Sequence, residues 1–162
     1  MKAGRDVRRR RLIVAGLLAL LIEFAVRSYV RPPDPPIDAA AGVNAHGRVP
    51  PAVMSTLRHA CFDCHSDEAR RPWYAALPVA AWVIERDITA GRGQLNFSRW
   101  THYNKLDRAD LLDKACDKAT KRDMPLWQYR LLHPEARLRE AEVAALCAWT
   151  QDEAARLVEA GS

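Results

Sequence analysis

The sequence has few segments in which apolar and polar residues alternate, which is the pattern that a half-buried β-strand produces. It also contains no internal repeat, no low-complexity tract and no second pair of closely spaced cysteines. No grouping of acidic, histidine and hydroxyl side chains has the spacing of a catalytic acid–base or nucleophile set. These absences argue against a sheet-based fold, a repeat protein and an enzyme.

Excess positive charge is confined to the start of the chain. The sequence has 25 Lys and Arg against 20 Asp and Glu, and residues 1–11 hold six of the basic and one of the acidic side chains. The remaining residues therefore hold 19 of each sign and sum to zero. Because no basic stripe is left to follow phosphate groups, we expect no nucleic-acid partner.

The basic N-terminus, residues 1–11, precedes an apolar segment at residues 12–30, LIVAGLLALLIEFAVRSYV. A basic flank before an apolar run is typical of an export signal or a signal anchor, and about twenty apolar residues cross a bilayer. No small-residue cleavage pattern directly follows the run, so we expect an uncleaved transmembrane anchor. The arginines before it predict a cytoplasmic N-terminus and place everything after Val30 on the outer side.

Residues 31–51 hold six of the ten prolines of the chain. Proline favours extended structure, so we expect this segment to be a semi-rigid linker between the membrane and a folded domain at residues 52–158. That domain is large enough for one small core.

Four segments of the domain have the spacing of amphipathic helices: 52–60, 77–91, 107–123 and 138–160. Pro50 and Pro51 suit the start of the first helix, and Gly91 is placed to end the second as a C-cap residue. The apolar positions of the second helix are Val79, Trp82, Val83 and Ile84. Four short helices leave a thin core, so we predict an all-α domain in which a bound group fills part of the interior.

The segment HACFDCHSD has Cys61 and Cys64 two residues apart and His65 directly after them. A structural zinc site needs four ligands, and the second cysteine pair is missing. A thioredoxin-like dithiol needs a strand that leads into a helix, and no strand is expected here. C-x-x-C-H is the attachment pattern of c-type haem, in which two thiols form thioethers with the vinyl groups and the histidine ligates the iron. We interpret these residues as a haem attachment site, with an ordinary disulfide in an oxidising compartment as the remaining alternative.

The second axial ligand of the iron is then expected among the methionines and histidines downstream. Met124 lies in the charged loop KRDMPLWQY directly before Pro125, where a helix cannot continue. A methionine in such a loop is placed to contact a ligand, and a Met/His pair raises the reduction potential of haem iron. His133 is the rival ligand, and an open iron site is the third possibility.

From Cys61 to about Thr150 the chain resembles the small haem-binding domain family of bacterial membrane-anchored monohaem cytochromes c. The resemblance rests on CFDCHS, PWYAALPVAAWVIERDITAGR, LNFSRW, MPLWQY, HPEARL and CAWT, which occur in the order of the family. It implies a cytochrome c-like helical fold around one haem, with an N-terminal signal anchor. It also implies that Cys61 and Cys64 are the thioether positions, that His65 is the proximal ligand, and that Met124 belongs to a Met-Pro element.

Aromatic residues between these motifs are expected either to pack on one another or to line the haem. They are Trp73, Tyr74, Trp82, Trp100, Trp127 and Tyr129. Among nearby polar residues, we expect Asn96 near the haem and either Arg92 or Trp100 to donate a hydrogen bond to a haem propionate. Pro72 or Pro78 is expected to offer a backbone carbonyl to the non-ligating nitrogen of His65.

Cys116 and Cys147 lie on the inward faces of the last two predicted helices. In an exported domain, buried free thiols and a disulfide between these helices are equally compatible with the pattern.

The sequence as a whole predicts a monohaem c-type cytochrome with one covalent haem c, which transfers single electrons at the outer face of the cytoplasmic membrane. Its expected partner is a redox protein or a membrane complex, and we do not expect it to be an enzyme. The alternative is a haem-based sensor or a peroxidase-like enzyme with an open distal iron site.

Overall fold

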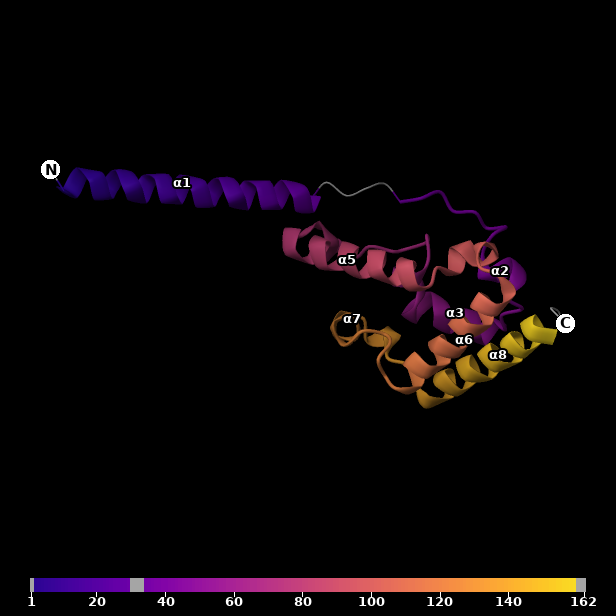
Figure 1. Cartoon of the computed structure of the whole chain (residues 1–162). Coiled ribbons are helices and arrows are strands. Elements are labelled where there is room, and N and C mark those ends of the chain that lie inside the picture. Colours follow the sequence, from indigo (N-terminus) through magenta and orange to yellow (C-terminus); the bar gives the residue numbers. More distant parts are fainter. Residues whose placement is uncertain (1, 30–33, 160–162) are drawn as a thin grey trace. The chain divides into compact units, whose positions relative to one another are not determined.

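The computed structural model describes residues 2–29 and 34–159. All regular secondary structure in these residues is helical, and no strand occurs among them (Figure 1). The order of helices, where η marks a 3-10 helix, is α1 (Lys2–Tyr29), α2 (Val43–His46), α3 (Pro51–Ala60), α4 (Phe62–His65), η1 (Trp73–Ala76), α5 (Pro78–Gln94), η2 (Phe97–His102), α6 (Lys105–Thr120), α7 (Trp127–Leu132), η3 (Pro134–Ala136) and α8 (Glu140–Glu159). The prediction of an all-α chain is therefore confirmed for the part of the chain that is described.

These elements form two compact units. One unit contains α1, η1 and the first half of α5, up to Arg86. The other begins at Asp34, gains the second half of α5 from Asp87, and contains all the remaining helices. Helix α5 is therefore shared by both units.

Helix α1 includes most of the segment that the sequence predicts to cross a membrane. Residue 30 of that segment and residues 31–33 of the predicted linker lie outside the described residues. Among the described residues, no helix combines the length and the apolar character that a membrane crossing requires.

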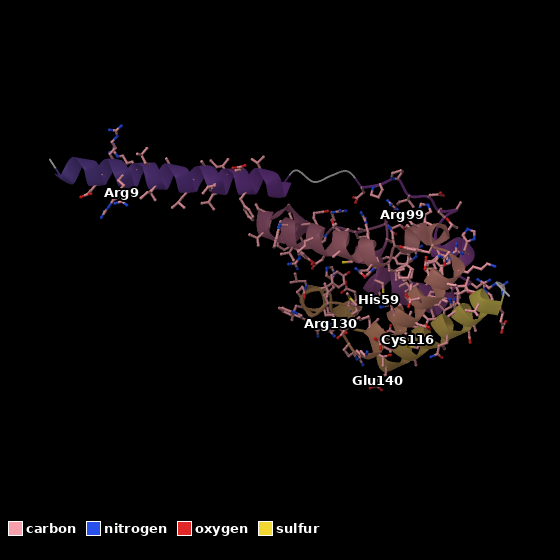
Figure 2. All side chains as sticks on the ribbon, in the orientation of Figure 1. Arg9, His59, Arg99, Cys116, Arg130 and Glu140 are labelled. Atoms are coloured by element: carbon pink, nitrogen blue, oxygen red, sulfur yellow. A yellow bond between two sulfur atoms is a disulfide. The ribbon has the colours of Figure 1, made fainter. Side chains whose placement is uncertain are left out.

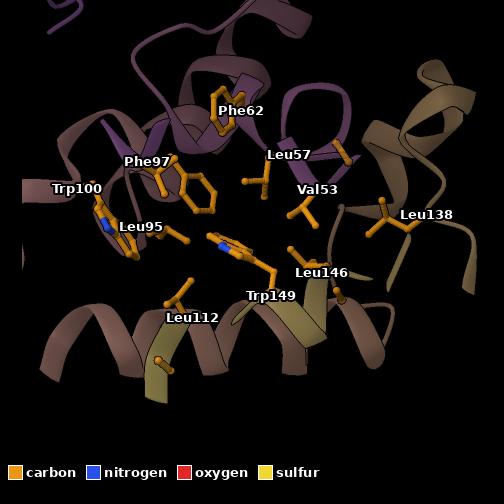
Figure 3. Packing of buried hydrophobic residues seen from close by; sticks show 14 of the residues in the cluster. Val53, Leu57, Phe62, Leu95, Phe97, Trp100, Leu112, Leu138, Leu146 and Trp149 are labelled. Carbon is orange, nitrogen blue, oxygen red and sulfur yellow. The ribbon is translucent and has the colours of Figure 1, made fainter. Parts of the chain in front are cut away.

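The core of the second unit forms where α3, α6 and α8 meet. Val53, Leu57 and Ala60 of α3 are buried, as the helical spacing predicts. Figure 3 shows Trp149 of α8 lying among core side chains from several elements. The buried hydrophobic residues of this core are Val43, Val53, Leu57, Ala60, Phe62, Leu95, Phe97, Trp100, Ala109, Leu112, Ala119, Ala136, Leu138, Leu146, Trp149, Ala154 and Leu157.

Helix starts in this core follow from local chemistry. Pro51 occupies the first turn of α3, where no intrahelical partner is required for its nitrogen. Asn104 caps α6, and its side-chain oxygen accepts a hydrogen bond from Asp107 N at 2.9 Å.

The segment before α3, which the sequence predicts to be a linker, also contributes residues to the core. Val43 of α2 is fully buried, and Trp149 Nε1 donates a hydrogen bond to the carbonyl oxygen of Gly47 at 2.9 Å. The Thr101 N–H also donates to the carbonyl oxygen of Ala41 at 3.1 Å. The folded unit therefore starts earlier along the chain than residue 52.

The second predicted helix differs from expectation in two ways. Gly91 does not end α5, because the helix continues to Gln94. Val79 and Trp82 are exposed, and Ile88 and Gly91 are the buried residues of this helix. The prediction of a C-cap at Gly91 is thus wrong. The glycine instead allows a close backbone contact, which is described with the site below.

Cys116 of α6 and Cys147 of α8 form a disulfide. Figure 2 labels Cys116 where these two helices lie side by side. Both cysteines are half-buried, and 31 positions separate them along the sequence. Of the two possibilities that the sequence leaves open, the structure has the disulfide.

Replacement of both cysteines, Cys116→Ala with Cys147→Ala, is expected to lower the free energy of unfolding by about 3–4 kcal/mol, because a loop of this length restricts the unfolded chain. Denaturant unfolding without reductant measures the difference. Reduction of the wild-type disulfide should have the same effect, whereas the double variant should not respond to reductant. Equal stability of the variant and the oxidised wild type would contradict the expectation.

Candidate functional site

The C-x-x-C-H segment folds into a single helical turn. Cys61 precedes α4, and its carbonyl oxygen accepts hydrogen bonds from Cys64 N at 3.2 Å and from His65 N at 2.9 Å. We call residues 61–65 the attachment turn. A turn of this kind points successive side chains in different directions, so that each residue meets a different neighbour.

Phe62 anchors the attachment turn in the core. It is buried, and its ring stacks on Phe97 with centroids 5.5 Å apart and an angle of 27° between the planes. Phe97 in turn lies against Trp100, with centroids 6.3 Å apart. The first of the two residues between the cysteines therefore fixes the turn to the hydrophobic interior.

Helix α5 passes very close to the backbone of the attachment turn. A Cβ atom placed on Gly91 would lie 2.5 Å from the carbonyl oxygen of Cys64 and 3.1 Å from its carbonyl carbon. Backbone atoms cannot move aside as a flexible side chain can, so glycine is required at this position. The close approach explains why a helix interior contains a residue that the sequence alone suggests as a helix end.

The close approach brings the end of α5 to the ring of His65. His65 Nδ1 lies 3.0 Å from the carbonyl oxygen of Leu95, and a carbonyl can only accept, so Nδ1 carries the proton. The other ring nitrogen, Nε2, is then an acceptor that can bind a metal. The carbonyl comes from Leu95, so the prediction of Pro72 or Pro78 as its source is wrong.

The charge state of His65 suits a ligand. Burial lowers the pKa of His65 below its ordinary value, and the hydrogen bonds with the backbone of Leu95 and Gly91 oppose this shift only in part. A neutral imidazole is the form that coordinates metals.

Cys61 and Cys64 are both free thiols and do not form a disulfide with each other. Burial, and secondarily the neighbouring Cys64, raises the pKa of Cys61 to about 12. Burial, followed by the charges of Asp87 and Asp63, raises the pKa of Cys64 to about 11. Redox-active dithiols depend on a lowered thiol pKa, so this environment does not match such a centre.

Asp63, the second residue between the cysteines, is also buried. Its Oδ1 atom accepts hydrogen bonds from Arg70 N at 3.1 Å and Arg70 Nε at 3.2 Å, and its Oδ2 atom accepts one from the Tyr129 hydroxyl at 2.7 Å. The attachment turn is thus bonded to α7, which follows the Met-Pro element in sequence.

A second buried carboxylate, Asp67, lies just after the attachment turn. It accepts hydrogen bonds from Asn96 Nδ2 at 2.8 Å and Arg99 Nε at 3.0 Å, and Arg92 Nε lies 3.6 Å away. Arg92 Nε also donates to the carbonyl oxygen of Ser66 at 2.8 Å. This network ties the segment after the turn to α5 and η2.

Two predicted cofactor contacts, Asn96 and Arg92, therefore have partners within the protein. The Asn96 side-chain oxygen caps η2 by accepting from Ser98 N at 3.0 Å. Arg92 Nη2 lies 3.5 Å from Asp34 Oδ1 and is buried without a hydrogen bond among the described residues. Their contact with a cofactor stays a prediction.

Trp100 has an unsatisfied donor. Its side chain is 0% exposed, and Nε1 has no hydrogen-bond partner among the described residues. A buried polar group without a partner costs about 1–3 kcal/mol, so an acceptor from a bound group would relieve a real penalty. This observation agrees with the predicted hydrogen bond to a haem propionate, which nonetheless stays a prediction.

The predicted contacts Trp73 and Tyr74 belong to the other compact unit. Both lie in η1, with their rings edge to face at 5.8 Å, and Trp73 is 82% exposed. Nothing in that unit by itself tests whether they contact a cofactor.

Met124 and His133, the two candidates for the second axial ligand, differ in their surroundings. Met124 lies in the loop between α6 and α7 and is 36% exposed, outside the hydrophobic core. The His133 ring stacks on Tyr129 with centroids 4.3 Å apart, and its Nδ1 lies 2.9 Å from Glu135 Oε1. The His133 ring is therefore held by neighbouring groups, whereas the Met124 thioether lies in an exposed loop.

Four residues that position the turn, Asp63, Asp67, Gly91 and Leu95, are absent from the sequence-based set. The two aspartates stand in CFDCHSD itself, and a charged residue beside buried cysteines could have suggested a buried partner. Leu95 acts through its backbone, which no side-chain pattern reveals.

The residues present fit a haem. The chain offers two free thiols at the required spacing, a neutral histidine with Nε2 available, and a buried indole N–H that lacks an acceptor. Among the described residues, no group of three or more His, Cys, Asp and Glu could hold a bare metal ion instead.

Comparison with known proteins supports the same cofactor. A family model described as a haem-binding domain matches residues 18–152. No curated protein and no solved structure shows a significant match. Because the matched region covers most of the chain, including the attachment turn, the protein belongs to the haem-binding domain family.

Proposed function

We propose that this protein is a monohaem c-type cytochrome that carries single electrons at the outer face of the cytoplasmic membrane. The observation that carries the proposal is the attachment turn, where Cys61 and Cys64 are free and the Leu95 carbonyl orients His65. Membership of the haem-binding domain family supports haem as the cofactor.

Covalent attachment is supported by the chemistry of the two thiols. They are two residues apart on one helical turn, as thioether formation with two vinyl groups requires. Their raised pKa values disfavour disulfide exchange, which needs a thiolate as the attacking group. The two thiols are not bonded to each other, as attachment to two vinyl groups requires.

Bound haem would supply an iron that changes its charge by one electron, and the protein's contribution is to hold that iron in one ligand environment. His65 provides a neutral nitrogen whose orientation is held by Leu95. Phe62 and Gly91 keep the turn fixed to the core and to α5. A rigid ligand set changes little between oxidation states, which suits electron transfer.

Met124 is the proposed second axial ligand. Its sulfur is neutral and soft, it stands in a loop rather than in the core, and a Met/His pair is typical of electron-carrying cytochromes c. If His65 and Met124 both held the haem iron, no position would be left there for a substrate, as an electron carrier requires. The partner is a redox protein or a membrane complex.

The N-terminal segment is proposed to tether the domain to the membrane. The apolar run at residues 12–30 lies within a region that is helical up to Tyr29, and a cluster of arginines precedes it. Thioether formation with haem takes place outside the cytoplasm, which agrees with export of the domain.

Covalent haem is expected on the full chain made together with a cytochrome maturation system. Its intact mass should exceed that of the polypeptide by one haem, and the pyridine haemochrome spectrum should be that of two thioethers. Cys61→Ser and Cys64→Ser should each leave at most one thioether and shift that spectrum. Ser162→Ala, at the end of the chain, is a control that should leave it unchanged. A colourless wild type of bare polypeptide mass would refute the proposal.

Met124→Ala is expected to abolish the methionine-to-iron charge-transfer band of the ferric protein in the near infrared, because the thioether is removed. The covalent haem content should be unchanged. Met54→Leu, in α3, is the matched methionine control and should keep the band. High-spin iron in the untreated wild type would instead favour the sensor or peroxidase alternative.

Leu17→Arg combined with Leu21→Arg is expected to release the protein from the membrane fraction. Each arginine placed in an apolar span opposes insertion by about 2.5–3.5 kcal/mol. Alkaline washing of isolated membranes, followed by detection of the protein, provides the measurement. Leu106→Arg, at an exposed position of α6, is the control that should remain membrane-bound. Wild-type protein that washes off completely would contradict the tether.

A further inference from the structure

Asp63 connects the attachment turn with a distant part of the chain. It lies between the two cysteines, and both of its carboxylate oxygens accept hydrogen bonds. One oxygen is used by Arg70, which is only seven residues away and has an exposed side chain. The other is used by Tyr129, which is 66 positions further along the sequence. Only the bond to Tyr129 links separate helices.

Tyr129 is well suited to hold α7 in place. Its hydroxyl donates to Asp63 Oδ2 at 2.7 Å, a short bond to a carboxylate, and such bonds are stronger than those between neutral groups. Its ring stacks almost parallel on His133, with an angle of 15° between the planes. On the same helix, Gln128 Nε2 donates to Asp87 Oδ2 of α5 at a longer 3.3 Å. The tyrosine therefore makes the shorter of these two contacts of α7.

The loop that carries Met124 is held at both ends. At its start, the carbonyl oxygen of Lys118 in α6 accepts hydrogen bonds from Asp123 N at 3.0 Å and Met124 N at 3.2 Å. At its end, α7 begins at Trp127 and reaches the attachment turn through Tyr129. Loss of the tyrosine bond would leave this end of the loop with the longer contact between Gln128 and Asp87, while the start of the loop stays fixed at Lys118.

We propose that the hydrogen bond between Tyr129 and Asp63 is a positioning contact that keeps the Met124 loop in register with the attachment turn, so that the thioether stays on the iron. This inference rests on the proposed function, in which Met124 is the second axial ligand. Tyr129 and Asp63 act through Met124 and touch neither the iron nor a substrate. With haem bound, the tyrosine bond would set how firmly Met124 is held against displacement by an external ligand.

Tyr129→Phe tests the proposal, because it removes the donor and keeps the ring that stacks on His133. The full chain with its covalent haem is titrated with imidazole in the ferric state, and the near-infrared methionine band is followed. We expect a weaker band and an apparent imidazole affinity about tenfold higher than in the wild type, since a bond to a charged group no longer holds the loop.

Thr150→Val is the matched control for loss of stability. The Thr150 hydroxyl of α8 is buried and also makes one hydrogen bond in the interior, donating to the carbonyl oxygen of Cys147 at 3.0 Å. This variant should keep the band and the imidazole affinity of the wild type.

The outcomes separate this inference from the function on which it rests. A strong band with unchanged imidazole affinity in Tyr129→Phe would overturn the positioning contact and leave the cytochrome intact. Equal changes in Thr150→Val would also overturn it, because they would show a general loss of stability. Covalent haem without any methionine band in the wild type would overturn both the ligand and the contact. Absence of covalent haem would overturn the function itself.

Discussion

The close approach of α5 to the attachment turn is the constraint on which the site depends. Only a glycine at position 91 lets the helix backbone lie against Cys64, and this brings the Leu95 carbonyl within 3.0 Å of His65 Nδ1. The carbonyl fixes the tautomer of the histidine, and the tautomer leaves Nε2 free to bind a metal. A larger residue at position 91 would push the Leu95 carbonyl away from His65. The same contact therefore sets both the packing of α5 and the orientation of the histidine.

Two buried aspartates, Asp63 within the attachment turn and Asp67 just after it, hold the turn to neighbouring elements. Asp63 is bonded to α7 and to Arg70, and Asp67 is bonded to Asn96 and Arg99. Each carboxylate faces a guanidinium group, and buried charges are tolerated where such partners are present. Between them, the histidine is kept neutral by burial. The charged groups therefore lie around His65, the proposed iron ligand, which is itself uncharged.

The sequence predicts the helical elements well and their ends less well. The spacing of apolar residues identifies α3, α6 and α8, because their inward faces repeat regularly over several turns. The same reasoning ends α5 at Gly91, because a glycine after an amphipathic run is usually a C-cap. The structure uses that glycine for a contact with a segment 27 residues away, which no local pattern records.

In the site, too, the sequence predicts local features and misses contacts between residues that are far apart along the chain. Cys61, Cys64 and His65 are recognisable because their chemistry depends on spacing along the chain. The partner of His65 is not, because Leu95 contributes a backbone oxygen that every residue type possesses. Val79 and Trp82 are apolar positions of the helical pattern, yet both are exposed, because an apolar spacing does not reveal whether a partner surface is present.

The disulfide between Cys116 and Cys147 gives the Met124 segment a particular property. It closes the chain into a covalent ring that contains both Met124 and Tyr129, between two helices that pack on each other. If α7 detaches from the turn, the thioether can drift only as far as this ring allows. In the proposed cytochrome, its effective concentration near the iron would therefore stay high, and recapture would compete with ligands from solution.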